Sequence, residues 1–172
     1  MTSLRPAAIA LLLIAATLFA RQEPLQAAEL AAPTGPVVLT VSGAIGVRNS
    51  GDTAVFDIAA LEALPKTEIR TSTPWTGVST FEGVSLADLL AAVGATGATI
   101  KATALNDYTV EIPAADAALG AIIAYRVDGK QLSVRDKGPL WIVYPFDENP
   151  ALKTETNFAR CIWQLQALKI EP

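Results

Sequence analysis

The sequence predicts an α+β domain built from many short strands and a few short helices. β-Branched and apolar runs alternate with clusters of Gly, Pro, Asn and Asp, which is typical of strands separated by turns. The helical segments between them are also short, and the chain shows no internal repeat. Such a mixture is typical of the α+β class. The predicted strands cover residues 37–41, 55–56, 67–73, 100–105, 108–112, 122–127, 140–144 and 162–170.

Capping residues indicate where the helices begin. Asp57 and Ser85 each precede a helical segment, and Asp88 follows Ser85 by three residues in a near capping-box arrangement. Pro113 opens a third segment, since proline is tolerated at the first turn of a helix. The predicted helices cover residues 58–64, 86–93 and 114–119.

Three segments are interpreted as turns or loops. Residues 74–84 contain an early tryptophan and two glycines, which favours a long loop after the strand at 67–73. The pairs at 106–107 and 128–129 are tight turn signals between strands. Residues 151–157 are polar and predict either a loop or a helical turn.

The N-terminal segment predicts export from the cell. One basic residue, Arg5, precedes fifteen almost unbroken apolar residues at 6–20, and small residues follow up to Ala28. This is the pattern of a secretory signal. The apolar run is shorter than the roughly 20 residues that span a bilayer as a helix.

We therefore expect a signal peptide at residues 1–28, a flexible lead at 29–36 and one domain at 37–172. The predicted location is the periplasm or the secreted fraction. Arg21 follows the apolar run directly, and no ideal cleavage site is present. An uncleaved membrane anchor therefore stays open as the alternative.

Composition excludes several classes of function. The formal net charge is −4, which argues against nucleic acid as a partner. The chain has no histidine, and so lacks the commonest metal ligand and general base. A zinc hydrolase or a Ser-His-Asp enzyme is therefore excluded. The single cysteine, Cys161, has no partner for an intramolecular disulfide, and its apolar neighbours predict a buried thiol.

Three segments together resemble the oxidoreductase molybdopterin-binding domain, the sulfite-oxidase-like family. They are Phe-Glu-Gly-Val-Ser-Leu-Ala-Asp-Leu-Leu at 81–90, Ala-Leu-Asn-Asp-Tyr-Thr-Val-Glu-Ile-Pro at 104–113, and Gly-Pro-Leu-Trp-Ile-Val-Tyr-Pro at 138–145. Ile-Trp-Gln-Leu at 162–165 follows the last of them. The resemblance covers roughly residues 37–170. It implies a mixed, barrel-like β-sheet fold with short helices that binds a molybdopterin-like pterin.

Two positions depart from the pattern of redox-active members. Those members resemble one another in holding molybdenum through a cysteine after the strand that is 67–73 here. This chain has Thr-Ser-Thr-Pro-Trp at 71–75, and a hydroxyl is a poor ligand for a soft metal. Trp141 also stands where active members have arginine. The resemblance therefore implies a pterin bound without molybdenum.

In lacking the molybdenum-binding cysteine, the chain resembles a branch of short, exported, single-domain relatives that bind a pterin. This resemblance implies a non-catalytic periplasmic sensor that reports to the periplasmic domain of a membrane cyclic-dinucleotide signalling enzyme. A molybdenum-cofactor oxidoreductase, or a subunit of one, with Ser72 or Thr73 as an unusual ligand, is the alternative. An interaction module whose cleft has closed is a third hypothesis.

A flat pterin needs a stacking face and a few fixed polar groups. The candidate ligand-binding residues are Trp75, Asn106, Asp107, Tyr108, Arg135 and Lys137. Trp75 would supply the stacking face, and the two cations would bind a phosphate or polar tail. Each has a structural alternative, as a lid over the core, a turn former or a solvated charge. Trp141 and Trp163 lie inside apolar runs and are interpreted as core residues.

Overall fold

The computed structural model describes residues 30–172, so the predicted signal peptide lies outside the described residues. Within residues 30–172, no helix is long and apolar enough to cross a membrane. The start of this segment is tied to the domain. The backbone amides of Thr34 and Gly35 donate to the Asp57 carboxylate at 2.8 and 2.7 Å.

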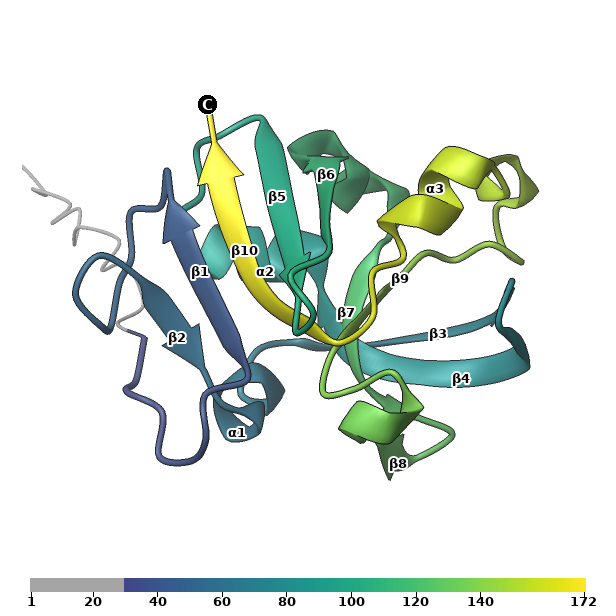
Figure 1. Ribbon diagram of the computed structural model, residues 1–172, viewed down its shortest axis with the longest axis horizontal. Helices are drawn as coiled ribbons and strands as arrows, with labels where there is room; N and C mark the ends of the chain where they lie inside the picture. Colours follow the sequence, from purple (N-terminus) through teal and green to yellow (C-terminus); the bar gives the residue numbers. More distant parts are fainter. Residues whose placement is uncertain (1–29) are drawn as a thin grey trace, which may run out of the picture.

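The first sheet has five strands and is mixed. Its first and last strands in the chain lie side by side and pair in parallel, and the other neighbours pair antiparallel. The last strand therefore lies inside the sheet, between the first and the fifth (Figure 1). In spatial order the strands are β2 (Ala54–Phe56), β1 (Leu39–Gly43), β10 (Leu165–Glu171), β5 (Thr99–Ala104) and β6 (Thr109–Pro113).

The second sheet is antiparallel throughout. Its spatial order is β3 (Lys66–Thr73), β4 (Thr76–Ser85), β7 (Ile122–Val127) and β8 (Lys130–Gln131), and β9 (Trp141–Val143) also pairs with β7. Among the described residues the two sheets are not closed into a barrel. The predicted α+β class and mixed sheets are confirmed.

Short helices connect the strands, and the predicted caps form. Asp57 accepts a hydrogen bond from the Ala60 amide at 2.7 Å, and Ser85 accepts one from the Asp88 amide at 2.9 Å. Residues 151–157, left open between loop and helical turn, contribute to two helical segments. The helices are α1 (Ile58–Glu62), α2 (Leu86–Ala92) and α3 (Glu155–Arg160), with 3-10 turns η1 (Ala114–Leu119), η2 (Val134–Asp136) and η3 (Pro150–Leu152).

The prediction of a long loop at 74–84 is wrong. Only Pro74 and Trp75 form a turn, and residues from Thr76 onward form β4, which pairs with both β3 and β7. Gly83, one of the two glycines that suggested a loop, is present for a different reason. A Cβ at Gly83 would collide with the carbonyl oxygen of Ile123, so glycine is needed where β4 and β7 approach closely.

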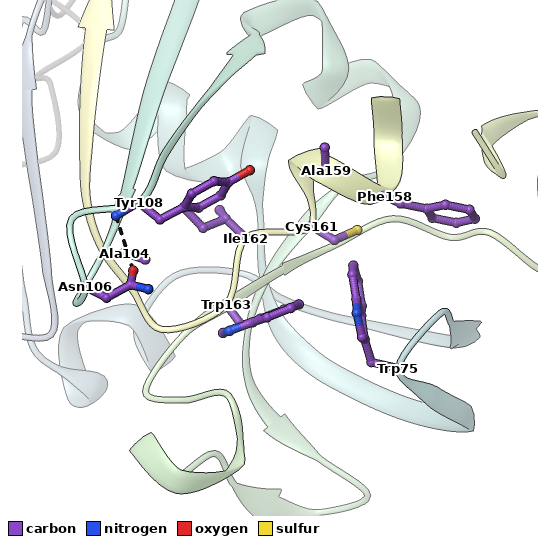
Figure 2. Close-up of a pocket in the computed structure, with 9 residues that line it drawn as sticks. All are labelled: Trp75, Ala104, Asn106, Tyr108, Phe158, Ala159, Cys161, Ile162 and Trp163. Carbon is purple, nitrogen blue, oxygen red and sulfur yellow. Dashed lines mark hydrogen bonds between the residues drawn. The ribbon is translucent and has the colours of Figure 1, made fainter. Parts of the chain in front are cut away.

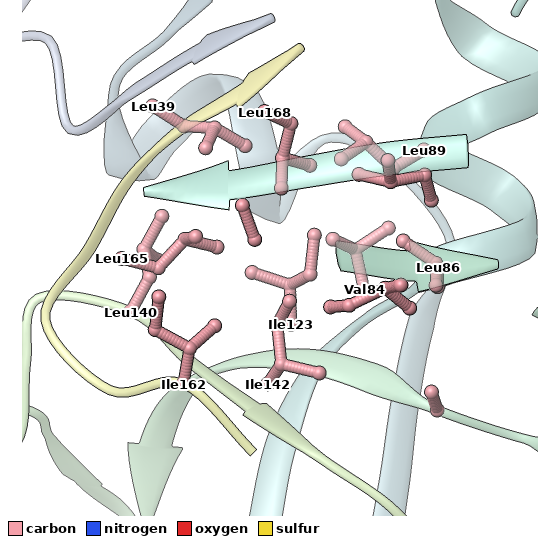
Figure 3. Packing of buried hydrophobic residues seen from close by; sticks show 14 of the residues in the cluster. Leu39, Val84, Leu86, Leu89, Ile123, Leu140, Ile142, Ile162, Leu165 and Leu168 are labelled. Atoms are coloured by element: carbon pink, nitrogen blue, oxygen red, sulfur yellow. The ribbon is translucent and has the colours of Figure 1, made fainter. Parts of the chain in front are cut away.

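The main core lies between the two sheets and α2 (Figure 3). Alternate residues of β7 and β9 face opposite sides, as the pleat of a strand requires. Ile123 and Ile142 enter the main core, whereas Ile122, Trp141 and Val143 pack into a smaller cluster with Phe81 and Ile69. The apolar run at 140–144 is therefore buried on both faces, one of the two environments that the sequence predicted.

Candidate functional site

A cleft of about 290 Å³ opens where the β3–β4 hairpin tip, the β5–β6 turn and the segment after α3 meet (Figure 2). These three parts are far apart in the sequence, and the fold brings them together. The cleft is open, so the hypothesis of a closed interaction module is not supported. Its lining residues are Trp75, Ala104, Asn106, Tyr108, Phe158, Ala159, Cys161, Ile162 and Trp163.

Indole rings form one side of the cleft. The rings of Trp75 and Trp163 meet edge to face, with centroids 4.8 Å apart and planes at 79°. Buried Trp141 supports them from beneath, at 6.2 Å from Trp75 and 6.4 Å from Trp163. The Trp141 indole N–H donates to the Cys161 carbonyl at 3.1 Å, which fixes this support. Trp75 is 40% exposed and offers ring surface to a ligand.

The hairpin tip is held by threonine hydroxyls. Thr73 Oγ1 accepts hydrogen bonds from the Trp75 and Thr76 amides at 3.2 and 3.1 Å, and lies 2.9 Å from Thr76 Oγ1. A hydroxyl that satisfies backbone amides in this way stabilises a tight turn. Thr73 therefore sets the position of Trp75 at the edge of the cleft.

Asp147 attaches the hairpin to the turn that follows β9. Its carboxylate accepts hydrogen bonds from the Ser72 amide at 2.7 Å and the Ser72 hydroxyl at 2.8 Å, and from Lys153 at 2.8 Å. The Asp147 amide donates to Thr71 Oγ1 at 3.0 Å. The hydrogen bonds from Lys153 and Ser72 lower the pKa of Asp147 to about 2, so it is ionised at neutral pH.

The only thiol of the chain lies in the cleft wall. Cys161 is 1% exposed, as its apolar neighbours predicted. Burial raises the pKa of Cys161 to about 12, so the group is a neutral thiol at physiological pH. In this state it is a poor nucleophile.

The α3 side of the cleft is fixed by a buried polar cluster. The Tyr144 hydroxyl donates to Asp116 Oδ2 at 2.7 Å, and Arg160 Nη1 donates to the same oxygen at 3.0 Å. Burial, together with the bond to Asp116, raises the pKa of Tyr144 well above its ordinary value. Asn157 donates to the Leu152 carbonyl at 3.0 Å and so ties α3 to η3.

The structure brings three of the six candidate ligand-binding residues into the cleft lining. They are Trp75, Asn106 and Tyr108. Asn106 also has the turn-forming role given as its alternative, since its Oδ1 accepts a hydrogen bond from the Tyr108 amide at 3.2 Å. Tyr108 is 52% exposed and lies at the mouth, where the sequence placed it.

The other three candidates do not line the cleft. Asp107 is an exposed turn residue with a φ of 63°, and Arg135 is exposed on η2. The Lys137 ammonium lies 5.6 and 5.9 Å from the ring centres of Trp141 and Trp163. This cation–π contact connects Lys137 to a lining residue without placing it in the lining.

The interpretation of Trp141 as a core residue is confirmed, and that of Trp163 holds only in part, since Trp163 packs against the smaller core cluster and also lines the cleft. Trp163 is only partly buried and lines the cleft, because β10 begins at Leu165 and Trp163 precedes the regular strand. Gln164, with a φ of 52°, breaks the strand pattern between them. The polar Gln164 within the apolar run was the available signal.

The acidic and thiol side chains do not gather into a metal centre. Within residues 30–172, no group of three or more Cys, Asp or Glu residues is close enough to hold a metal ion. The chemistry that the lining offers is ring stacking, together with hydrogen bonds from the Asn106 amide, the Tyr108 hydroxyl and the indole N–H groups.

The fold is a two-sheet α+β domain with an open cleft walled by indole rings, and comparison with known proteins identifies its family. Residues 39–147 match the model of the oxidoreductase molybdopterin binding domain, and the chain belongs to this family. The family resemblance that the three sequence segments indicated is therefore confirmed. No curated protein sequence matches the chain.

A solved structure with a similar fold is the sulfane dehydrogenase SoxCD from Paracoccus pantotrophus. It is 18% identical, with a TM-score of 0.57, and the match covers 77% of this chain. The chain spans 37% of the length of that protein's chain. At this identity the likeness concerns the fold alone.

Proposed function

We propose that this chain is a non-catalytic, periplasmic pterin-binding protein that acts as a ligand sensor. The observation that carries the proposal is the open cleft walled by Trp75 and Trp163, with Asn106 and Tyr108 at its mouth. Aromatic walls with a few neutral polar groups suit a flat heterocycle with donors and acceptors on its edge. Membership of a molybdopterin-binding family supports a pterin as that heterocycle.

The donor groups around the cleft support a ligand without molybdenum. A thiolate suits this soft metal, but Cys161 is a buried, neutral thiol. The residues expected to replace the family's cysteine are also engaged, since Ser72 binds Asp147 and Thr73 caps the hairpin turn. The residues present therefore fit the organic ring and do not fit the metal.

The partner and the location in this proposal rest on the sequence. The apolar segment at 6–20 supports export. A sensor that binds a ligand without transforming it reports its occupancy to another protein. We propose the periplasmic domain of a membrane cyclic-dinucleotide signalling enzyme as that partner. Co-purification of the two from membranes, increased by added pterin, is the expected result.

Analysis of the protein purified natively from its own host tests the function. Mass spectrometry of the released small molecules is expected to find a reduced pterin. Elemental analysis of the same sample is expected to find molybdenum far below one atom per chain. About one molybdenum per chain would contradict the proposal.

A molybdenum-cofactor oxidoreductase, or a subunit of one, is the second candidate. Membership of an oxidoreductase molybdopterin-binding family supports it. It predicts turnover with an artificial electron acceptor that is lost in Ser72→Ala or Thr73→Ala. Pterin binding without turnover, unchanged in Ser72→Ala, would favour the sensor instead.

A further inference from the structure

The cleft lining carries no formal charge. None of its nine residues is Asp, Glu, Lys, Arg or His, and its thiol is neutral. Its polar side chains are the Asn106 amide, the Tyr108 hydroxyl and the indoles of Trp75 and Trp163, and all four are neutral (Figure 2). Such groups bind the carbonyl and ring nitrogens of a neutral heterocycle.

Two nearby cations are paired with carboxylates, and two others lie outside the cleft lining. Arg160 donates to Asp116 at 3.0 Å, and Lys153 pairs with Asp147 at 2.8 Å. Lys137 lies over the rings of Trp141 and Trp163, and Arg135 is exposed on η2 outside the lining. A phosphate that entered the cleft would lose its water without gaining a paired charge, which is strongly unfavourable.

The surroundings of the cleft also oppose an anion. The chain carries a net charge of −4, and a negative field disfavours the approach of a negative ligand.

The volume of the cleft also favours a small ligand. About 290 Å³ lies at the lower end of the range of roughly 300–1,000 Å³ that is typical of small-molecule pockets. A two-ring heterocycle with a short side chain suits this volume better than a larger, tailed molecule. Size and charge therefore favour the same kind of ligand.

We propose that the cleft selects an uncharged pterin with a short neutral side chain and rejects the phosphorylated form of the same ring. This inference rests on the proposed function and narrows its ligand class. It departs from the expectation that Arg135 and Lys137 bind a phosphate tail, because the fold places neither in the cleft lining.

Isothermal titration of the full mature chain with 7,8-dihydroneopterin and with its monophosphate, in 150 mM salt, tests this inference. The neutral ring is expected to bind at least about tenfold more tightly, since the phosphate loses solvation without a partner. Equal or tighter binding of the monophosphate would overturn the inference while the proposed function stands. If neither compound binds, the proposed function falls and the inference with it.

Two variants sharpen the test. Ala159 is exposed and lines the cleft, so Ala159→Lys adds a cation there and is expected to reduce the preference for the neutral ring at least about threefold. Lys137→Gln removes the cation that lies over Trp141 and Trp163, and because Lys137 does not line the cleft the preference is expected to stay unchanged. A loss of monophosphate binding in Lys137→Gln would show that this lysine reaches the ligand and would overturn the inference.

Discussion

The hairpin wall, formed by β3, β4 and Trp75 at their tip, and the α3 wall of the cleft are held in different ways. Exposed polar groups fix the first, chiefly Asp147 with Ser72 and Lys153. Buried Asp116 and Tyr144, joined by the partly buried Arg160, fix the second. The same kind of hydrogen bond has different consequences in the two places, because a buried group has no water to replace a lost partner. The hairpin wall is therefore suited to ligand contact, and the α3 wall to stability.

The largest expected effect is on the α3 wall. Asp116→Ala removes the shared acceptor and leaves the buried Tyr144 hydroxyl unpaired, which destabilises the fold by about 2–4 kcal/mol. Urea unfolding followed by tryptophan fluorescence measures the change. Asp116→Asn keeps an acceptor oxygen and is the matched control, with a smaller loss. A change below about 0.5 kcal/mol in Asp116→Ala would show that the cluster is not a structural anchor.

The next effect is on the hairpin wall and on binding. Trp75→Ala removes the exposed indole face and is expected to weaken pterin binding by about 1–3 kcal/mol, the value of one aromatic stacking contact. The free energy of unfolding should change much less than in Asp116→Ala, because Trp75 is 40% exposed. Titration of both variants compares the walls directly. Unchanged affinity in Trp75→Ala would exclude it as the stacking face.

A smaller effect is expected from the hairpin attachment. Asp147→Ala removes the acceptor for the Ser72 amide and hydroxyl and leaves Trp75 less well positioned. We expect a loss of pterin affinity of about threefold, with the secondary structure unchanged, since exposed ion pairs contribute little to stability. Asp52→Ala, on a turn remote from the cleft, serves as the control. A pterin affinity equal to that of the wild type would show that Asp147 does not position Trp75.

The smallest effect is a pH dependence. The pKa of Asp147 is lowered to about 2 from its usual value near 3.8, so its contribution is complete above pH 3.8 and is lost as the pH falls toward 2. Pterin affinity should therefore stay level from pH 8 to about pH 4 and then decline. Asp147→Asn should lack this part of the decline. An equal decline in the wild type and in Asp147→Asn would show that another titratable group causes the loss of affinity.

Sequence patterns predicted the parts of the molecule that depend on local signals. The caps at Asp57 and Ser85 and the turn at residues 128–129 follow from residue chemistry within a few positions. The strand β4 could not be predicted in this way, because Gly83 reflects close contact with Ile123, a neighbour forty positions away in the chain. Long-range packing overrode the local loop signal there.

The prediction of the cleft residues was limited to local signals in the same way. Trp75, Asn106 and Tyr108 were chosen from turn positions, and the fold brings them into one lining. Phe158, Ala159 and Trp163 were missed as lining residues because their exposure depends on α3 meeting the hairpin, which no local pattern encodes. They also lie beyond residues 39–147, the part that matches the family model.

The parallel pairing of β1 with β10 has a consequence for how the chain assembles. β10, at residues 165–171, joins β1 to β5, so the first sheet stays in two pieces until that stretch is available. Contacts between such distant positions form slowly. A ribosome that still holds residues 165–171 would therefore carry an incomplete sheet. Folding of this sheet has to wait until that stretch has emerged, and the chain stays accessible to proteases until then.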